Sequence, residues 1–265
     1  MAKKDIVPVF GDIHGNLEGL VNTMEFIQRE FSLFPDIVLQ VGDMGYFPGE
    51  IPSTEKIRSD QELLFHNYLS DFDYSRRICD NASFSYQVVF VRGNHEDQES
   101  LKNLSINKPH GSYVDAQKRF WFIPDAQAVC IDNENYISLV GFGGIDSSTR
   151  PKAYKVERLI AFSEDKIEEI GNMSGIDILM THQGPKDTVS GSDMIDVLID
   201  LARPKIHLHG HSHREYSQTL FGDVRSYGLG KMPSINRPFL ESNDFYGFLD
   251  TKSLDFSFGT PIPLY

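Results

Sequence analysis

The sequence predicts a layered α/β fold, and three observations lead to this prediction. Short β-rich runs alternate with segments of helical periodicity. Polar residues with neighbouring glycines directly follow several of the apolar runs. The 265 residues contain no repeat, low-complexity tract or linker, so we expect a single domain over residues 1–265.

The first half of the chain alternates between strand and helix patterns. A helix is expected from Leu17 to Phe31, because apolar residues recur there at three- and four-residue steps, and Asn16 is its expected cap. A charged, aromatic segment from about 53 to 80 also has helical character. Strands are expected at IVPVF (6–10), DIVLQV (36–41) and YQVVFV (86–91).

The second half contains further β-type runs and a helix. FWFIPDAQAVCID (120–132) and NYISLVGFGG (135–144) are typical of paired strands with polar turns. A helix is expected over 194–201, and Pro204 ends it. Strands are expected at DILMTH (177–182) and KIHLH (205–209), and the part from 214 to 265 is β-rich.

Composition and charge limit the classes of function. The chain is 40% hydrophobic and 24% charged, as in a globular protein with a sizeable core. The net charge of −13 argues against non-specific nucleic-acid binding, but it allows a site that recruits an anionic substrate through bound cations. Cys79 and Cys130 are typical of reduced thiols. Without a long apolar run, we expect a soluble, cytoplasmic protein with no membrane partner.

Five short segments place metal-ligand side chains at the ends of expected strands. They are GDIHG (11–15), GDMGY (42–46), GNHE (93–96), THQGP (181–185) and GHSH (210–213). Because ligands of α/β sheets gather at the carboxyl ends of strands, these segments are expected to meet at one edge. Oxygen and imidazole ligands together favour Mn, Fe, Zn or Co over Ca or Mg. Each segment alone is compatible with a turn or a cap, but the ordered set predicts a metal site.

As an ordered set, the segments resemble the D-x-H, G-D, G-N-H-[DE], H and G-H-x-H pattern of the calcineurin-like metallophosphoesterase superfamily, over residues 11–213. The resemblance implies a four-layer αββα sandwich with two mixed β-sheets and two divalent metal ions at the strand ends. It also implies hydrolysis of phosphomonoesters or phosphodiesters by a metal-activated hydroxide. Carried over by position, the metal ligands would be Asp12, His14 and His213 for one ion, Asn94, His182 and His211 for the other, and Asp43 as the bridge.

The resemblance makes His95 the general acid that protonates the leaving oxygen. Glu96 or Asp97 is a candidate to orient the His95 ring from behind, and a solvated loop charge is the alternative for both carboxylates. His209 is a candidate to support the neighbouring ligand His211, whereas His207 lies deeper on the strand and is expected to be a hydrogen-bonded core residue.

The chain departs from one branch of the superfamily. The protein serine/threonine phosphatases and the symmetrical diadenosine tetraphosphatases carry an arginine for the substrate phosphate soon after the second motif's aspartate. Here GDMGYFPGE (42–50) contains no basic residue, which places the chain in the broader superfamily. Candidate replacements are Arg150, Lys152 and His110, although each is also compatible with a solvated surface residue. Arg92 is expected to support the loop that follows it.

The resemblance therefore implies a metal-dependent phosphoesterase that acts on small phosphorylated molecules, nucleotides among them, or on phosphoproteins. A nuclease is one alternative, and the acidic net charge and the lack of basic tracts disfavour it. A catalytically silent scaffold of the same fold is the other. The presence of every expected ligand and of His95 disfavours the scaffold.

Overall fold

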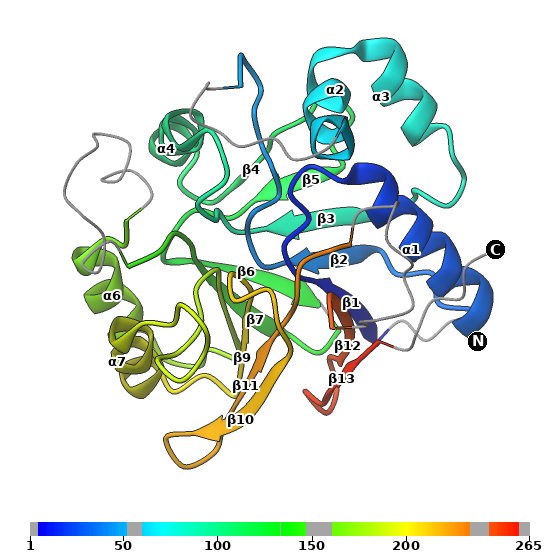
Figure 1. The fold of residues 1–265 in the computed structure, drawn as a ribbon. Coiled ribbons are helices and arrows are strands. Elements are labelled where there is room, and N and C mark those ends of the chain that lie inside the picture. The colour runs from blue at the N-terminus through cyan, green and yellow to red at the C-terminus, as the bar shows by residue number, and fades with distance from the viewer. Residues whose placement is uncertain (1–4, 52–59, 133, 147–160, 234–243, 260–265) are drawn as a thin grey trace.

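Figure 1 shows the computed structural model of the chain, which describes residues 5–51, 60–132, 134–146, 161–233 and 244–259. Within these ranges, two mixed β-sheets lie in the middle of the molecule, and helices flank them on both sides. A search of the same ranges for a helix long and apolar enough to cross a membrane finds none.

The first sheet contains, among the described residues, seven strands in the order β13-β12-β1-β2-β3-β5-β4. Strands β1, β2, β3 and β5 run parallel, whereas β12, β13 and β4 pair antiparallel with their neighbours. The bounds are β1 Ile6–Phe10, β2 Ile37–Gln40, β3 Gln87–Phe90, β4 Ser112–Tyr113, β5 Phe120–Phe122, β12 Tyr246–Asp250 and β13 Phe256–Phe258. The parallel strands therefore direct their carboxyl ends to one edge of the sheet.

The second sheet contains six described strands in the order β10-β11-β9-β8-β7-β6. Strands β7, β8, β9 and β11 run parallel, and β6 and β10 pair antiparallel at the two edges. The bounds are β6 Gln127–Asp132, β7 Ile137–Phe142, β8 Ile178–Thr181, β9 Ile206–His209, β10 Tyr216–Leu220 and β11 Val224–Gly228.

Helices pack on the outer face of each sheet (Figure 1). The first sheet carries α1 Leu17–Phe31, the 3-10 turn η1 Asp60–Leu63, α2 Leu64–Ser70, α3 Phe72–Cys79 and α4 Gln98–Asn107. The second sheet carries α6 Glu164–Gly171 and α7 Asp193–Ala202. The expected cap of α1 is confirmed, because the Asn16 side chain accepts a hydrogen bond from the backbone N–H of Gly19 at 3.0 Å.

Three apolar clusters hold the layers together. One joins the helices around α1 to the first sheet and includes Phe10, and a second lies between the sheets and includes Val9 and Met180. The third joins α6 and α7 to the second sheet and includes Leu198. Phe10 and Val9 are neighbours in β1 but belong to different clusters, because successive side chains of a strand point to opposite faces. The four-layer αββα order implied by the resemblance is thus confirmed.

Two segments differ in detail from expectation. The run over 120–132 contains two strands: β5 pairs with β3 in the first sheet, and β6 pairs with β7 in the second. Pro124 lies at the crossing point, where its missing N–H costs no ladder hydrogen bond. The expected helical segment is divided at Asp71, which caps α3 by accepting hydrogen bonds from two backbone N–H groups, and residues 52–59 lie outside the described ranges.

Candidate metal centre

Five strands end where the ligand-bearing segments begin, and the structure brings these segments together. Three of these strands, β1, β2 and β3, belong to the first sheet, and β8 and β9 belong to the second. The expected ligands that follow them, in the same order, are Asp12, Asp43, Asn94, His182 and His211. Backbone hydrogen bonds join the segments within each sheet: His14 N donates to Asp43 O at 2.7 Å, and Gly210 N donates to His182 O at 2.9 Å. The carboxyl edges of both sheets therefore contribute to one cluster.

A first group of ligand atoms comes from both sheets. Its atoms lie within 4.8 Å of one another and belong to Asp12, His14, Asp43 and His213. His213 Nε2 lies 2.9 Å from Asp12 Oδ2, and His14 Nε2 lies 3.4 Å from Asp43 Oδ2. Both aspartates are buried while His213 is exposed, so this group opens to solvent on the His213 side.

A second group lies beside the first and shares one residue with it. Asp43, His182 and His211 also offer ligand atoms within 4.8 Å of one another. His182 Nε2 lies 3.4 Å from Asp43 Oδ1 and 3.2 Å from the Asn94 side-chain oxygen. His182 Nδ1 lies 3.0 Å from the Val41 carbonyl, so an N–H at Nδ1 donates there and leaves Nε2 to face the group.

Asp43 lies between the two groups. Its Oδ2 faces His14 of the first group, and its Oδ1 faces His182 of the second. Oδ1 also accepts hydrogen bonds from the backbone N–H groups of Asn94 and His95, at 2.7 and 2.8 Å. The carboxylate is therefore fixed in the position that a bridging ligand would take.

Two buried polar atoms of the first group make no hydrogen bond of good geometry among the described residues, and they are Asp12 Oδ2 and His14 Nε2. The nearest cationic group to Asp12 Oδ2 is the ring of His213, whose Nε2 lies 2.9 Å away as an ion-pair contact. Asp12 Oδ2 and His14 Nε2 both point into the group, within 4 Å of each other. Oxygen and imidazole donors without thiolate suit a borderline transition ion, and an ion held here would satisfy both orphaned atoms. The residues therefore fit a metal.

The charges of the cluster lead to the same inference. Burial alone would raise the pKa of Asp43, but the charges of His182, His14 and His95 hold it well below its ordinary value. Burial likewise opposes ionisation of Asp12, whose pKa is nevertheless lowered by His14 and His213. Against its own desolvation, His182 has its pKa raised to about 10, mainly by Asp43. The ionised aspartates thus draw positive charge to the cluster, and bound cations would supply that charge in place of the His182 proton.

Backbone strain concentrates at the expected ligands. His14, Asp43, His211 and His213 have φ values of 48°, 55°, 63° and 55°. The left-handed region is uncommon for residues other than glycine, and such strain costs roughly 1–3 kcal/mol per residue. Four of the seven expected ligands adopt it, which indicates that the surrounding loops force these side chains inward.

Two glycines let the backbone approach the carboxylates closely. A Cβ atom on Gly93 would lie 2.1 Å from Asp43 Oδ1, and one on Gly210 would lie 2.2 Å from Asp12 Oδ1. No side chain fits at either position. The glycines of the GNHE and GHSH segments are therefore part of the geometry that holds the two aspartates.

His95 lies next to the first group without belonging to either set of ligand atoms. Its ring centroid is 4.8 Å from that of His14, and the side chain is half-buried. Its backbone N–H is anchored on Asp43 Oδ1. The ring is thus held at the rim of the cluster, where a group bound at the aspartates would be within reach.

The two carboxylates expected near the His95 ring have well-defined partners elsewhere. Glu96 accepts hydrogen bonds from the backbone N–H groups of Met44 and Gly93, each at 2.6 Å. Burial, followed by the charge of Asp43, raises the pKa of Glu96 to about 8. Asp97 caps α4 by accepting from the Ser100 N–H at 3.0 Å. Glu96 therefore ties together the loops after β2 and β3, and orientation of His95 by either residue stays a prediction.

Two glutamines support the ligand loops, and sequence reasoning missed both. Gln40 donates to the Gly11 carbonyl at 3.1 Å and accepts from the Gly42 N–H at 3.1 Å. Gln98 donates to the Gly93 carbonyl at 3.0 Å. The only available signal was a glutamine at the end of an apolar strand and another in the first turn after GNHE.

The histidines of β9 lie below the cluster. His207 is buried, and its two ring nitrogens each lie 2.8 Å from a hydroxyl, of Thr181 and of Ser226, which confirms the expected core role. His209 is also buried, stacks on His207 with centroids 5.1 Å apart, and belongs to neither ligand group. Its Nε2 makes no hydrogen bond within the described residues. Its role in supporting the ligands stays a prediction.

Of the three expected substrate contacts, only His110 lies within the described residues. Arg150 and Lys152 lie outside the described residues. His110 is exposed and follows α4, whose ten residues extend ~15 Å away from the GNHE loop. Arg92 contacts Asp125 at 2.8 Å and also reaches the Gln98 side chain and the Ala161 carbonyl, so it supports the loop as expected.

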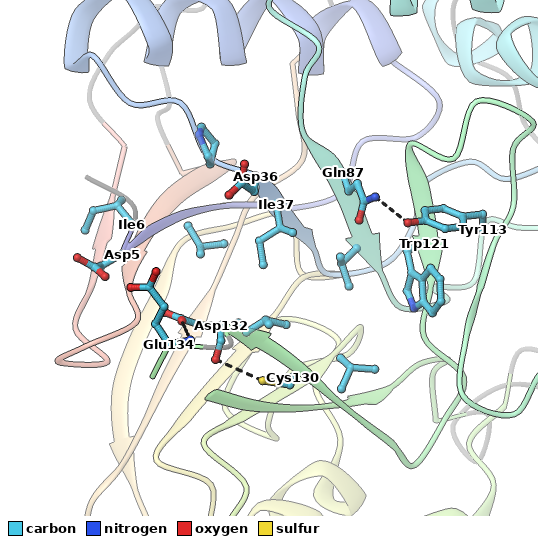
Figure 2. Close-up of a pocket in the computed structure, with 15 residues that line it drawn as sticks. Asp5, Ile6, Asp36, Ile37, Gln87, Tyr113, Trp121, Cys130, Asp132 and Glu134 are labelled. Atoms are coloured by element: carbon cyan, nitrogen blue, oxygen red, sulfur yellow. Dashed lines mark hydrogen bonds between the residues drawn. The ribbon is translucent and has the colours of Figure 1, made fainter. Parts of the chain in front are cut away.

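A cavity of about 500 Å³ lies elsewhere, at the amino ends of β1, β2 and β3 (Figure 2). Asp5, Asp36, Asp132 and Glu134 line it, and none of the described residues that line it is basic. Tyr113 and Trp121 lie at the other side of the cavity (Figure 2). An acidic cavity does not suit a phosphate, so it is unconnected with the cluster by both position and charge.

Comparisons with known proteins agree with this geometry. A family model described as calcineurin-like phosphoesterase matches residues 7–215. The solved structure of TT1561 from Thermus thermophilus has a TM-score of 0.57 at 14% identity, covering 98% of this chain and 100% of that chain. A dimetal phosphatase from Danio rerio has a TM-score of 0.52 at 13% identity, covering 94% of this chain and 92% of that chain. At these identities, the likeness concerns the fold. No curated protein matches the chain.

Proposed function

The chain belongs to the calcineurin-like phosphoesterase family, and we propose that it is a phosphoesterase that holds two divalent metal ions at Asp12, His14, Asp43, Asn94, His182, His211 and His213. Mn, Fe, Zn and Co are the candidate ions, since the donors are oxygen and imidazole. The observation that carries the proposal is the pair of ligand groups that share Asp43. A single carboxylate that faces both groups could serve as a ligand to two metal ions.

In this proposal the protein's own residues position the reaction. When bound, the metal ions supply Lewis-acid stabilisation of phosphate oxygens and a nucleophile at neutral pH. Asp43 holds the two sites at a fixed separation, because the loops after β2 and β3 are tied together through Glu96. His182 is kept in one tautomer by the Val41 carbonyl. Preorganisation of this kind avoids reorganisation during the reaction.

His95 is the proposed proton donor to the leaving oxygen. It lies beside the first ligand group, outside the ligand set, and its backbone is anchored on the shared aspartate. A positioned histidine contributes typically ~10²–10⁴-fold through proton transfer. In this role His95 would donate a ring proton to the leaving oxygen and then recover a proton from water.

The proposed substrates are phosphorylated small molecules, nucleotides among them, or phosphoproteins, handled by the chain as one domain. The net charge of −13 disfavours long nucleic acids, which bind through basic surface. The exposed side of His213 gives the ligand groups access to solvent and therefore to a substrate of this size.

The test is hydrolysis of p-nitrophenyl phosphate and bis-p-nitrophenyl phosphate by chelator-treated protein, before and after addition of Mn, Fe, Zn or Co. We expect metal-dependent hydrolysis of at least one ester, abolished in Asp43→Asn. Hydrolysis of neither ester with any metal would favour a scaffold. Metal-dependent cleavage of an oligonucleotide without turnover of either small ester would favour a nuclease.

A further inference from the structure

The loop that follows Asp43 offers no cation to a substrate. Met44, Tyr46 and Phe47 occupy it, and all three are buried. Their side chains pack into the protein where other branches of the family carry a phosphate-binding arginine. A side-chain cation that contacts the substrate phosphate beside the metal ions would therefore come from another element of the fold.

Lys231 lies beside the first ligand group. It forms a parallel bridge with Asp12, and the N–H of the next residue, Met232, donates to the Asp12 carbonyl at 2.8 Å. Two residues earlier, the Leu229 N–H donates to the His209 carbonyl at 2.8 Å. The segment after β11 is therefore fixed between the two sheets, next to an expected ligand.

The ammonium of Lys231 is held in place by a carboxylate. Its Nζ lies 3.1 Å from Glu62 Oε1, with the side chains 23% and 12% exposed. Glu62 packs against the turn that carries His14, because a Cβ on Gly15 would lie 2.1 Å from the Glu62 carbonyl oxygen. An ammonium has several N–H donors, and Glu62 accepts from one of them. The others are partly accessible to solvent near the His14 turn.

Other cations near the cluster are less suitable. The Arg92 guanidinium is already bonded to Asp125, Gln98 and a backbone carbonyl. Arg214 follows His213 directly but is exposed, and no ion pair within the described ranges fixes its position. Lys231 combines a fixed backbone, a held ammonium and partial exposure.

We propose that Lys231 is a substrate-binding residue whose ammonium contacts the non-bridging phosphate oxygens and favours phosphomonoesters over phosphodiesters. The inference rests on the proposed phosphoesterase function. A monoester phosphate carries up to two negative charges and a diester carries one, and attraction to a cation grows with that charge. Charge-assisted N–H···O⁻ contacts are also the stronger class of hydrogen bond.

The test uses Mn-loaded wild-type protein and the variants Lys231→Met, Lys231→Arg and Glu62→Gln. Calorimetric titration gives the Kd of inorganic phosphate, and steady-state kinetics give KM and kcat for the mono- and diester of p-nitrophenol. Lys252→Met is the matched control, because its ammonium pairs with Asp5 at 2.6 Å on the surface, away from the ligand groups. Elemental analysis checks that each variant retains its metal.

We expect Lys231→Met to raise the phosphate Kd and the monoester KM about tenfold or more, as for loss of a charged hydrogen bond. The diester KM should rise less, and kcat and metal content should stay close to wild type. Lys231→Arg retains the charge and should restore phosphate binding. Glu62→Gln keeps an oxygen that accepts a hydrogen bond from the ammonium and removes only a neighbouring negative charge, so phosphate binding should be unchanged or tighter. Lys252→Met should match wild type.

Two results would overturn the proposal. An unchanged phosphate Kd in Lys231→Met would show that the ammonium does not contact phosphate. Equal weakening in Lys231→Met and Glu62→Gln would show that the ion pair acts only by supporting the loop. If wild type hydrolyses neither ester but binds phosphate through Lys231, the phosphoesterase proposal fails and the phosphate site remains. If wild type is active and Lys231→Met is indistinguishable from it, only the Lys231 proposal fails.

Discussion

The same parallel strands have carboxylates at both ends, and the two sets differ in their burial and in the groups that contact them. At the carboxyl ends, Asp12 and Asp43 are fully buried, and the cationic groups nearest to their carboxylates are the imidazoles of other expected ligands, such as His213 at 2.9 Å from Asp12 Oδ2. At the amino ends, around the cavity of Figure 2, Asp132 accepts a hydrogen bond from the Thr251 hydroxyl at 2.6 Å. Asp5 pairs with Lys252 at 2.6 Å.

The difference shows why a count of acidic residues is a poor guide to function. Both ends contribute to the net charge of −13, but within the described residues the carboxyl ends alone combine buried aspartates, polar atoms that make no hydrogen bond and left-handed backbone. Unsatisfied polar atoms cost free energy, so they persist where another group completes them. The carboxyl ends are therefore arranged for a ligand, whereas Asp5 and Asp132 at the amino ends are paired within the fold.

The largest expected contrast comes from removing one charge at each end. Asp43→Asn should lower metal affinity about a hundredfold or more, because it removes the shared ligand, and activity should be lost with the metal. Asp36→Asn, at an exposed carboxylate of the amino-end cavity, should leave both unchanged. Elemental analysis of the dialysed proteins measures the difference. Wild-type metal content in Asp43→Asn would refute the bridging role.

Removing His95 separates chemistry from metal binding at the carboxyl ends. Since the ring lies outside both ligand groups, His95→Ala should retain its metal and lose roughly 10²–10⁴-fold in kcat. Turnover with p-nitrophenyl phosphate and metal content are measured on the same preparation. Full activity in this variant would remove His95 from the mechanism.

The boundary between ligands and core runs along the strand that ends at His209. His211→Ala should strip metal, because its ring belongs to the second ligand group. His209→Ala should weaken metal binding only about tenfold, as is typical for a residue that supports a ligand without touching the metal. Metal titrations of both variants measure this difference. An equally complete loss of metal from His209→Ala and His211→Ala would contradict the division between ligand and supporting residue.

The smallest effect is expected from a carboxylate of the amino-end cavity, in stability rather than activity. Although desolvation opposes it, hydrogen bonds from Thr251, Asn135 and Glu134 lower the pKa of Asp132 to about 2. A lowered folded-state pKa stabilises the fold above the ordinary pKa of an aspartate, and this contribution is lost as pH falls towards 2. Asp132→Asn should therefore unfold at a lower urea concentration than wild type at pH 6. The difference between the two urea midpoints should become smaller below pH 4, towards pH 2.

If the difference in urea midpoint between Asp132→Asn and wild type stays constant over this pH range, ionisation of Asp132 is excluded as its cause. Metal content and turnover at neutral pH serve as the control and should equal those of wild type. A loss of metal from Asp132→Asn would instead connect the two ends of the strands and contradict the comparison.

Much of the fold and the expected ligand set could be predicted because the signals are local. The strands before GDIHG, GDMGY and GNHE are short apolar runs, and each ends directly at its polar segment. The helix from Leu17 to Phe31 has the expected periodicity and cap.

The supporting contacts could not be predicted because they join residues far apart in the chain. Glu96 reaches the backbone of Met44 across 52 positions, and Lys231 pairs with Glu62 across 169. The division of 120–132 between two sheets depends on which strand each half meets, and strand periodicity carries no information about partners. The sequence pattern predicts the ligand set, whereas tertiary packing decides which residues support it.

The most direct test of the central claim is anomalous X-ray scattering from crystals of the Mn-loaded protein, measured at the manganese edge. The account predicts two separate peaks, one on each side of Asp43, between the ligand atoms of the two groups. A single peak, or peaks at the amino-end cavity instead, would contradict a dinuclear centre at the carboxyl ends of the strands.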